Sequence, residues 1–324
     1  MKTIGYVISH KNHERRRALL PNDIDRIQHS SMICVESGYG EALGFPDSDY
    51  SSRGVSVAPR NEVLACDALV DVKLGDADFM DQISPRKTLI GWAHIVQKTL
   101  FTDAAIANQH TVIAWENIME KGRYLFYRNR ELAGETAVLH AFSHYGRMPY
   151  DCRVAIIGNG MTARGALRTL SGLGAHVDVY TRKLEQLFRE NMADYDVIVN
   201  CVRWDTTRSD RLIYKSDLHR LKRGSMIIDV SCDTGLEIET SRPTTFDHPV
   251  YTVDGVLHYA VDNTPAMAYR TVSEIISKSF SPYVDAIIQN HSCPALEPAF
   301  VIRGGVVFDQ ECLAFRSRDQ EMEA

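Results

Sequence analysis

Three polar residues of the N-terminal half, Lys73, His94 and Glu116, each follow a short apolar segment. Together they bring a cation, a group that titrates near neutral pH and a carboxylate. Short apolar runs indicate buried strands, and the carboxyl ends of parallel strands meet at one edge of a sheet. We therefore expect the three side chains to converge, although any one of them alone would indicate only an ordinary loop residue.

A run of three arginines, Arg15–Arg17, follows the first predicted strand, residues 2–9. Ligands gather beyond the carboxyl ends of strands in α/β sheets, so the run predicts an anion site. A solvated basic loop explains the same residues, and composition alone does not separate the two interpretations.

A glycine-rich loop follows an apolar run in the middle of the chain. Gly158, Gly160 and Ala163 have the G-x-G-x-x-G/A spacing of dinucleotide-binding loops, and Met161 and Thr162 complete it. The first glycine permits a tight turn, the second lets the backbone approach a pyrophosphate, and the alanine lets the next helix pack closely. The first N–H groups of that helix would point at the phosphates. We predict a dinucleotide cofactor; the alternative is an α/β turn without a ligand.

The next predicted strand, Val177–Tyr180, ends in Thr181, Arg182 and Lys183. Sites for NAD normally have an acidic residue here, which bonds to the ribose 2′-hydroxyl. A hydroxyl and two cations suit a 2′-phosphate instead, so we predict NADPH/NADP as the cofactor. The alternative is that both cations only begin a solvated helix.

The order of elements predicts an α/β fold: two Rossmann-like domains with parallel sheets, an active-site cleft between them and two long linking helices. The linking helices are expected near residues 131–145 and 265–288. We expect a discontinuous substrate domain, residues 1–130 plus 289–324, and an NADP-binding domain, residues 131–288.

The C-terminal segment carries weaker signals. Residues 299–303 and 306–309 flank Gly304 and Gly305, which indicates a hairpin. The final residues, 319–324, are expected to fray.

Composition excludes several classes of protein. The chain has 324 residues with a net charge of −6, so it lacks the basic excess that nucleic acid requires. No apolar run reaches the length of a membrane helix, and the N-terminus resembles a strand rather than a signal peptide. The 7 cysteines form no C-x-x-C pair, which predicts reduced thiols, no metal site and a cytoplasmic protein.

Several ordered motifs resemble the alanine dehydrogenase and transhydrogenase family. The resemblance covers residues 1 to about 290 and includes Lys73, His94 and the glycine-rich loop. Its other motifs are Arg16–Pro21, Gly38–Phe45, Ala114–Glu116, Ile228–Asp233 and Ser241–Pro249.

Within that family, the chain is most similar to the N5-(carboxyethyl)ornithine synthase family. The opening Ile8–Pro21 carries this resemblance, together with Gly75–Asp78, Glu131–Glu135 and Thr162–Arg168. It implies an NADPH-dependent oxidoreductase that joins pyruvate to the side-chain amino group of ornithine or lysine. It also implies small-molecule substrates and a homo-oligomer, a dimer or tetramer.

The same resemblance implies roles for four residues. Arg16 matches the carboxylate-binding arginine, because a guanidinium can hold a carboxylate with two parallel hydrogen bonds. Lys73 matches a catalytic lysine that also contacts the substrate, beside the carbonyl oxygen. His94 matches the catalytic histidine that moves protons. Asp233 matches the essential aspartate of the cofactor domain.

Glu116 and Asp262 are expected to serve the α-ammonium group of the amino acid co-substrate, which needs an acidic partner. For Glu116 the alternative is a buried acid that accepts hydrogen bonds from backbone N–H groups.

Two other functions stay open. One is an amino acid dehydrogenase of the same fold, acting on alanine or lysine. The other is a non-catalytic NADP-binding protein, which the joint presence of Arg16, Lys73, His94 and Asp233 argues against.

Overall fold

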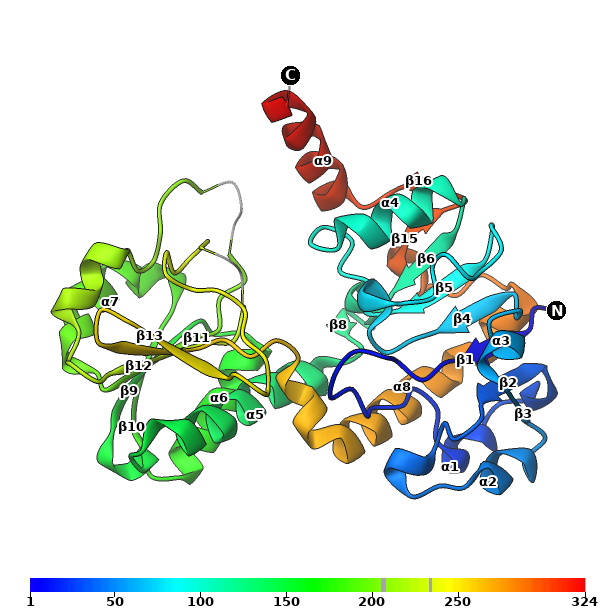
Figure 1. The fold of residues 1–324 in the computed structure, drawn as a ribbon, viewed down its shortest axis with the longest axis horizontal. Helices are drawn as coiled ribbons and strands as arrows, with labels where there is room; N and C mark the ends of the chain where they lie inside the picture. The colour runs from blue at the N-terminus through cyan, green and yellow to red at the C-terminus, as the bar shows by residue number, and fades with distance from the viewer. Residues whose placement is uncertain (205–207, 233–234, 324) are drawn as a thin grey trace. The chain divides into compact units, whose positions relative to one another are not determined.

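The computed structural model describes residues 1–204, 208–232 and 235–323, with the backbone alone for 318–323. The chain divides into two compact units (Figure 1). Unit 1 contains Met1–Phe126 and Tyr269–Ala324, and unit 2 contains Tyr127–Ala268. The α/β fold with two Rossmann-like units is confirmed.

Unit 1 is built on an eight-stranded sheet with the order β16-β15-β6-β5-β4-β1-β2-β3. The first six strands in the chain pair in parallel, whereas β15 runs antiparallel to β6 and forms a hairpin with β16, as predicted. The bounds are β1 (Ile4–Tyr6), β2 (Ile33–Glu36), β3 (Ser56–Ala58), β4 (Ala68–Val70), β5 (Thr88–Gly91), β6 (Thr111–Ala114), β15 (Phe300–Arg303) and β16 (Val306–Val307).

The central strands of unit 1 are largely apolar and buried, as is typical of parallel sheets that are covered on both faces. All three residues of β1 and of β4 are buried. The surrounding helices are α1 (Pro21–Ile24), α2 (Asp47–Ser51), α3 (Arg60–Val63), α4 (Thr99–Ala107), α8 (Tyr269–Gln289) and α9 (Gln310–Glu323), and a small hairpin joins β7 (Met119–Glu120) to β8 (Arg123–Tyr124).

Helix α8 belongs to unit 1, whereas the sequence analysis assigned residues 265–288 to the cofactor domain. Ser273 and Ser277 on α8 accept hydrogen bonds from the backbone N–H groups of Arg17 and Leu20, both at 2.8 Å. Figure 1 shows α8 alongside α1. Helical periodicity in a sequence predicts a helix without showing which sheet it packs against, so the contacts redraw this boundary.

The C-terminal segment forms the helix α9, Gln310–Glu323. Asp309 precedes the helix, and its carboxylate accepts a hydrogen bond from the N–H of Cys312 at 2.8 Å. This is an N-terminal cap, which stabilises a helix that lacks an apolar stripe.

Unit 2 is built on a six-stranded sheet with the order β10-β9-β11-β12-β14-β13, parallel except for β13. Strand β9 pairs with β10 on one side and β11 on the other, which is the point where ligands bind in open α/β sheets. The strands are β9 (Arg153–Ile157), β10 (His176–Tyr180), β11 (Val197–Asn200), β12 (Met226–Asp229), β13 (Val250–Val253) and β14 (Val256–Tyr259), and the helices are α5 (Tyr127–Tyr145), α6 (Met161–Gly172) and α7 (Glu185–Asn191).

Apolar clusters cover both faces of the sheet of unit 2. One cluster joins α5 and α6 to the sheet, and the other includes Phe188 of α7. Across the described residues of both units, no helix is long and apolar enough to cross a membrane.

Candidate functional site

The sheet of unit 1 brings four predicted residues to one edge. Strands β6, β5, β4 and β1 are neighbours in that order and run in parallel. Arg16, Lys73, His94 and Glu116 follow β1, β4, β5 and β6 respectively, so all four lie in loops beyond the carboxyl ends of adjacent strands.

Arg16 is held by a buried acid. Its side chain is 2% exposed, and its Nε and Nη2 donate to the two carboxylate oxygens of Glu14 at 2.8 and 2.6 Å. The guanidinium also lies over the ring of Trp92, with 5.1 Å from Cζ to the ring centroid. Glu14 therefore takes the Nε/Nη2 edge of the guanidinium and fixes its orientation.

Lys73 is also buried beside an acid. Its backbone N–H donates to the Asp71 carboxylate at 2.8 Å, and Asp71 itself is 1% exposed. Burial raises the pKa of Asp71 to about 6, and the hydrogen bond from Lys73 opposes this rise. The turn that presents Lys73 thus depends on a carboxyl group that titrates well above the usual aspartate range.

Asp76 gathers three lysines at the same edge. Its carboxylate lies 3.0 Å from the Nζ of Lys11 and 3.6 Å from the Nζ of Lys73, and it accepts a hydrogen bond from the Nζ of Lys98. Partial burial opposes ionisation, but the bond from Lys98 and the charges of Lys73 and Lys11 together lower the pKa of Asp76. Asp76 is therefore a fully ionised centre for the three ammonium groups.

Glu116 supports the turn that carries His94. Its carboxylate accepts hydrogen bonds from the backbone N–H of His94 at 2.5 Å and of Ala93 at 3.2 Å. His94 has a φ of 46°, a left-handed conformation that is uncommon outside glycine. The sequence left open that Glu116 accepts hydrogen bonds from backbone N–H groups, and the structure contains these bonds. They hold the backbone of His94 in place.

The glycine-rich loop of unit 2 has the open backbone that a pyrophosphate needs. Gly158 has a φ of 116°, and a Cβ there would lie 2.9 Å from the carbonyl oxygen of Cys201. Gly160 caps α6, and a Cβ there would meet no atom within 4 Å. Met161, Thr162 and Ala163 form the start of the helix, and Ala163 is buried. The loop therefore fits a dinucleotide phosphate at the helix N-terminus.

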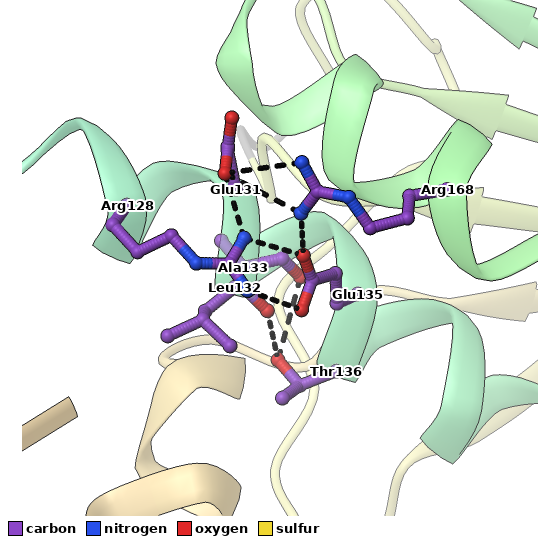
Figure 2. A network of polar contacts seen from close by, with 7 residues as sticks. All are labelled: Arg128, Glu131, Leu132, Ala133, Glu135, Thr136 and Arg168. Carbon is purple, nitrogen blue, oxygen red and sulfur yellow. Dashed lines mark hydrogen bonds and ion pairs between the residues drawn. The ribbon is translucent and has the colours of Figure 1, made fainter. Parts of the chain in front are cut away.

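Helix α5 holds the loop's helix, α6, in place (Figure 2). Arg168 of α6 donates to Glu135 of α5 at 2.5 Å and lies 3.4 Å from Glu131. The helices approach so closely that a Cβ on Gly165 would lie 1.9 Å from the carbonyl oxygen of Glu131, and one on Gly134 would lie 2.0 Å from that of Thr162. The sequence motifs 131–135 and 162–168 are thus two halves of one helix contact.

Thr181, Arg182 and Lys183 lie beyond the carboxyl end of β10, as predicted. Arg182 and Lys183 are exposed and begin a helical turn, Arg182–Leu184. This placement agrees with both interpretations of the sequence, a 2′-phosphate site and a solvated helix start. The nearest acid on the strand, Asp178, pairs with Arg153 at 3.1 Å.

Asp233 lies outside the described residues. The strand before it ends in Asp229, whose buried carboxylate accepts hydrogen bonds from Asn200 at 2.9 Å and from the hydroxyl of Ser241. Burial raises the pKa of Asp229, although these bonds oppose the rise. Asp262 follows β14, and its backbone N–H donates to the carbonyl of Thr244 at 3.2 Å.

Sequence reasoning missed the acids that position the cations, Glu14, Asp71 and Asp76. Glu14 and Asp71 each stand two residues before the cation that they support, Arg16 and Lys73. This acid-x-cation spacing is visible in the sequence and could have served as a signal. Among the described residues, no group of three or more potential ligands could hold a metal ion.

Two family models match most of the chain. Residues 9–126 match the model described as "Alanine dehydrogenase/PNT, N-terminal domain", and residues 181–314 match "Alanine dehydrogenase/PNT, C-terminal domain". The first lies within unit 1, and the second begins in unit 2 and ends in unit 1.

Individual relatives agree with the family models. An N(5)-(carboxyethyl)ornithine synthase of Lactococcus lactis subsp. lactis is 34% identical over 86% of this chain and 93% of that protein. An alanine dehydrogenase of Halomonas elongata is 29% identical over 86% of this chain and 85% of that protein. A solved L-alanine dehydrogenase structure has the same fold, with a TM-score of 0.82, 22% identity and coverage of 98% of this chain and 99% of that one.

Proposed function

Since the chain belongs to the N(5)-(carboxyethyl)ornithine synthase branch of the alanine dehydrogenase/PNT family, we propose that it condenses pyruvate with an amino acid's side-chain amine. The family makes the chain a nicotinamide-dependent oxidoreductase acting on CH–NH donors. The proposed co-substrate is L-ornithine or L-lysine, the reductant is NADPH, and the product is an N-(1-carboxyethyl) amino acid.

One observation carries the proposal: Arg16, Lys73 and His94 lie in loops that follow three adjacent parallel strands, β1, β4 and β5. An anion-binding guanidinium, an ammonium and an imidazole are the groups that a keto acid requires for attack by an amine. Glu14 and Glu116 orient two of these groups, which supports a catalytic role over a solvated loop.

The proposed roles follow from these contacts. Glu14 fixes the direction of the guanidinium of Arg16, which is proposed to bind the keto-acid carboxylate. The ammonium of Lys73 stabilises negative charge on the carbonyl oxygen as the amine nitrogen bonds to the carbonyl carbon. His94 transfers the protons that let the carbinolamine lose water to an imine. The nicotinamide, when bound, supplies the hydride that reduces the imine carbon.

The cofactor preference is proposed from unit 2. The open backbone at Gly160 would hold the pyrophosphate, and Thr181, Arg182 and Lys183 would bind the 2′-phosphate that distinguishes NADPH from NADH. Asp233 is proposed to relay protons or to steady the cationic imine. Glu116, which also accepts two backbone N–H groups, and Asp262 are the acids proposed for the α-ammonium group. The proposal also includes a homo-oligomer.

The test measures the rate of NADPH oxidation, followed by its absorbance, in the presence of pyruvate. Ornithine, lysine or ammonia is the amine, and NADH is the cofactor control. We expect oxidation with ornithine or lysine and none with ammonia. The rate should be higher with NADPH than with NADH. Oxidation with ammonia alone would instead make the chain an amino acid dehydrogenase.

A further inference from the structure

The lysine cluster around Asp76 contains a cation that the proposed mechanism does not use. Lys98 donates to the carboxylate of Asp76, which also lies near the ammonium groups of Lys73 and Lys11. The three ammonium groups thus contact one carboxylate, and Lys98, at 33% exposed, is the most exposed of the three lysines. An anion that approaches from solvent would therefore meet the ammonium of Lys98 first.

Lys98 is fixed beside the proposed catalytic residues. Its backbone N–H donates to the carbonyl oxygen of His94 at 2.9 Å, so it closes the turn that His94 begins. A Cβ on Gly75 would lie 2.9 Å from the Cγ of Lys98, so the glycine leaves room for the lysine stem next to the turn of Lys73. Two turns thus hold the ammonium at the edge where the keto acid is proposed to bind.

Two other acids of unit 1, Asp78 and Glu36, share the cation Arg60. Asp78 pairs with Arg60 at 2.5 Å and with His10 at 2.6 Å, and Glu36 pairs with Arg60 at 3.0 Å. Within the described part of the chain, Lys98 has Asp76 as its ion-pair partner, and its side chain is 33% exposed. An ammonium carries three donors, so Lys98 can bond to an incoming carboxylate while it keeps Asp76.

We propose that Lys98 binds the α-carboxylate of the amino acid co-substrate, an inference that rests on the proposed function. The condensation product carries two carboxylates, and Arg16 accounts for the one that comes from the keto acid. The second stands at the far end of the amino acid side chain from the reacting nitrogen. The ammonium groups of Lys98 and Lys73 contact the two oxygens of one carboxylate, that of Asp76, so Lys98 lies close to the proposed reaction centre. Lys98 therefore distinguishes an amino acid from a diamine of the same length.

The experiment compares L-ornithine with putrescine, the diamine that lacks the α-carboxylate. Initial rates of NADPH oxidation with pyruvate are measured for the wild type, Lys98→Met and Lys98→Arg, and for Lys121→Gln, an exposed lysine of the same unit, as the control. We expect Lys98→Met to lower kcat/KM for ornithine about tenfold or more, mainly through KM, because one charge-assisted hydrogen bond is lost. Its kcat/KM for putrescine should stay at the wild-type value, and Lys98→Arg should recover most of the loss.

Equal losses for ornithine and putrescine in Lys98→Met would overturn the assignment, because they would show a structural role. Unchanged ornithine kinetics would overturn it as well. Failure of the proposed function is distinguishable, because the wild type would then turn over ammonia but neither amino acid, or would turn over no amine at all. In either of those cases this inference is wrong together with the function.

Discussion

The two sheet edges present different groups to a ligand: charged side chains in unit 1 and backbone in unit 2. In unit 1 the loops beyond β1, β4, β5 and β6 present cations and a histidine, which the acids Glu14, Asp71, Asp76 and Glu116 orient. In unit 2 the loop beyond β9 presents backbone, opened by Gly158 and Gly160.

The difference follows from what each edge is proposed to bind. A pyrophosphate can be held by backbone N–H groups at a helix N-terminus, so shape suffices there. A small keto acid offers few atoms, so charged groups must meet it in fixed directions, and each buried cation needs an anion to offset its desolvation. Unit 1 should therefore be sensitive to the loss of charge, and unit 2 to the addition of volume.

The largest effect on stability is expected for Glu14→Gln. The change removes the buried ion pair between Glu14 and the guanidinium of Arg16, which should lower the free energy of unfolding by about 3–5 kcal/mol. Urea denaturation measures this loss. Asp194→Asn, which removes an exposed pair with Arg153, is the control and should change stability by less than about 1 kcal/mol. Similar values for the two variants would contradict the contrast between the edges.

Lys73→Met should lower kcat/KM about 10²–10³-fold, because the carbonyl oxygen loses the charge that stabilises it. Binding of NADPH, followed by its fluorescence, should not change, because the proposed phosphate ligands belong to unit 2. A parallel loss of cofactor affinity would show that the variant disturbs more than the proposed keto-acid site.

Arg182→Ala should raise the KM for NADPH about tenfold or more, the effect of one charge-assisted hydrogen bond to the 2′-phosphate. The KM for NADH should stay constant, because NADH lacks that phosphate. Arg223→Ala removes another exposed arginine of unit 2 and serves as the control. If both cofactors are affected equally, Arg182 does not read the 2′-phosphate.

Gly165→Ala should destabilise unit 2 by about 1–3 kcal/mol, because the new Cβ would lie 1.9 Å from the carbonyl oxygen of Glu131. Arg168→Ala, which removes the half-exposed ion pairs of the same helix contact, should cost less than about 1 kcal/mol. Thermal unfolding of the two variants compares volume with charge at one place. A larger loss for Arg168→Ala would reverse the rule proposed for unit 2.

A further prediction is a pH dependence of stability that arises from Asp71. Its pKa in the folded chain is about 6, above the ordinary 3.8, so the unfolded chain releases this proton first as pH rises. The unfolded state then binds fewer protons, and stability falls between about pH 4 and pH 6. Asp71→Asn should lack this fall, so the variant should gain stability relative to wild type across that window. Parallel stability curves for the two proteins would show that Asp71 has an ordinary pKa.

Sequence patterns predicted the parts of this fold that depend on local spacing. The strands that precede Lys73 and His94 are apolar runs, and the glycines of the loop at Gly158 have a characteristic spacing. Each can therefore be recognised without the rest of the chain. The contact of Glu116 could not be assigned in the same way. Glu116 reaches the backbone of His94 only because β5 and β6 pair, and no local pattern encodes that contact.

The same reason explains the errors at the domain level. Helix α8 has clear apolar periodicity, but its partner Arg17 lies far away in the sequence, so its unit could not be predicted. Helix α9 has no apolar stripe, which is the usual sequence signal of a helix, and it is capped by Asp309.

The placement of β15 and α8 in unit 1 has a consequence for the order of folding during synthesis. Unit 2 is continuous, so all of its chain is available once Ala268 has left the ribosome. Unit 1 must wait, because β15 completes its sheet beside β6 and α8 supplies partners for the backbone that follows Arg16. The first 126 residues therefore emerge with an unpaired strand edge at β6, and their folding is limited by translation of the domain inserted between the two halves.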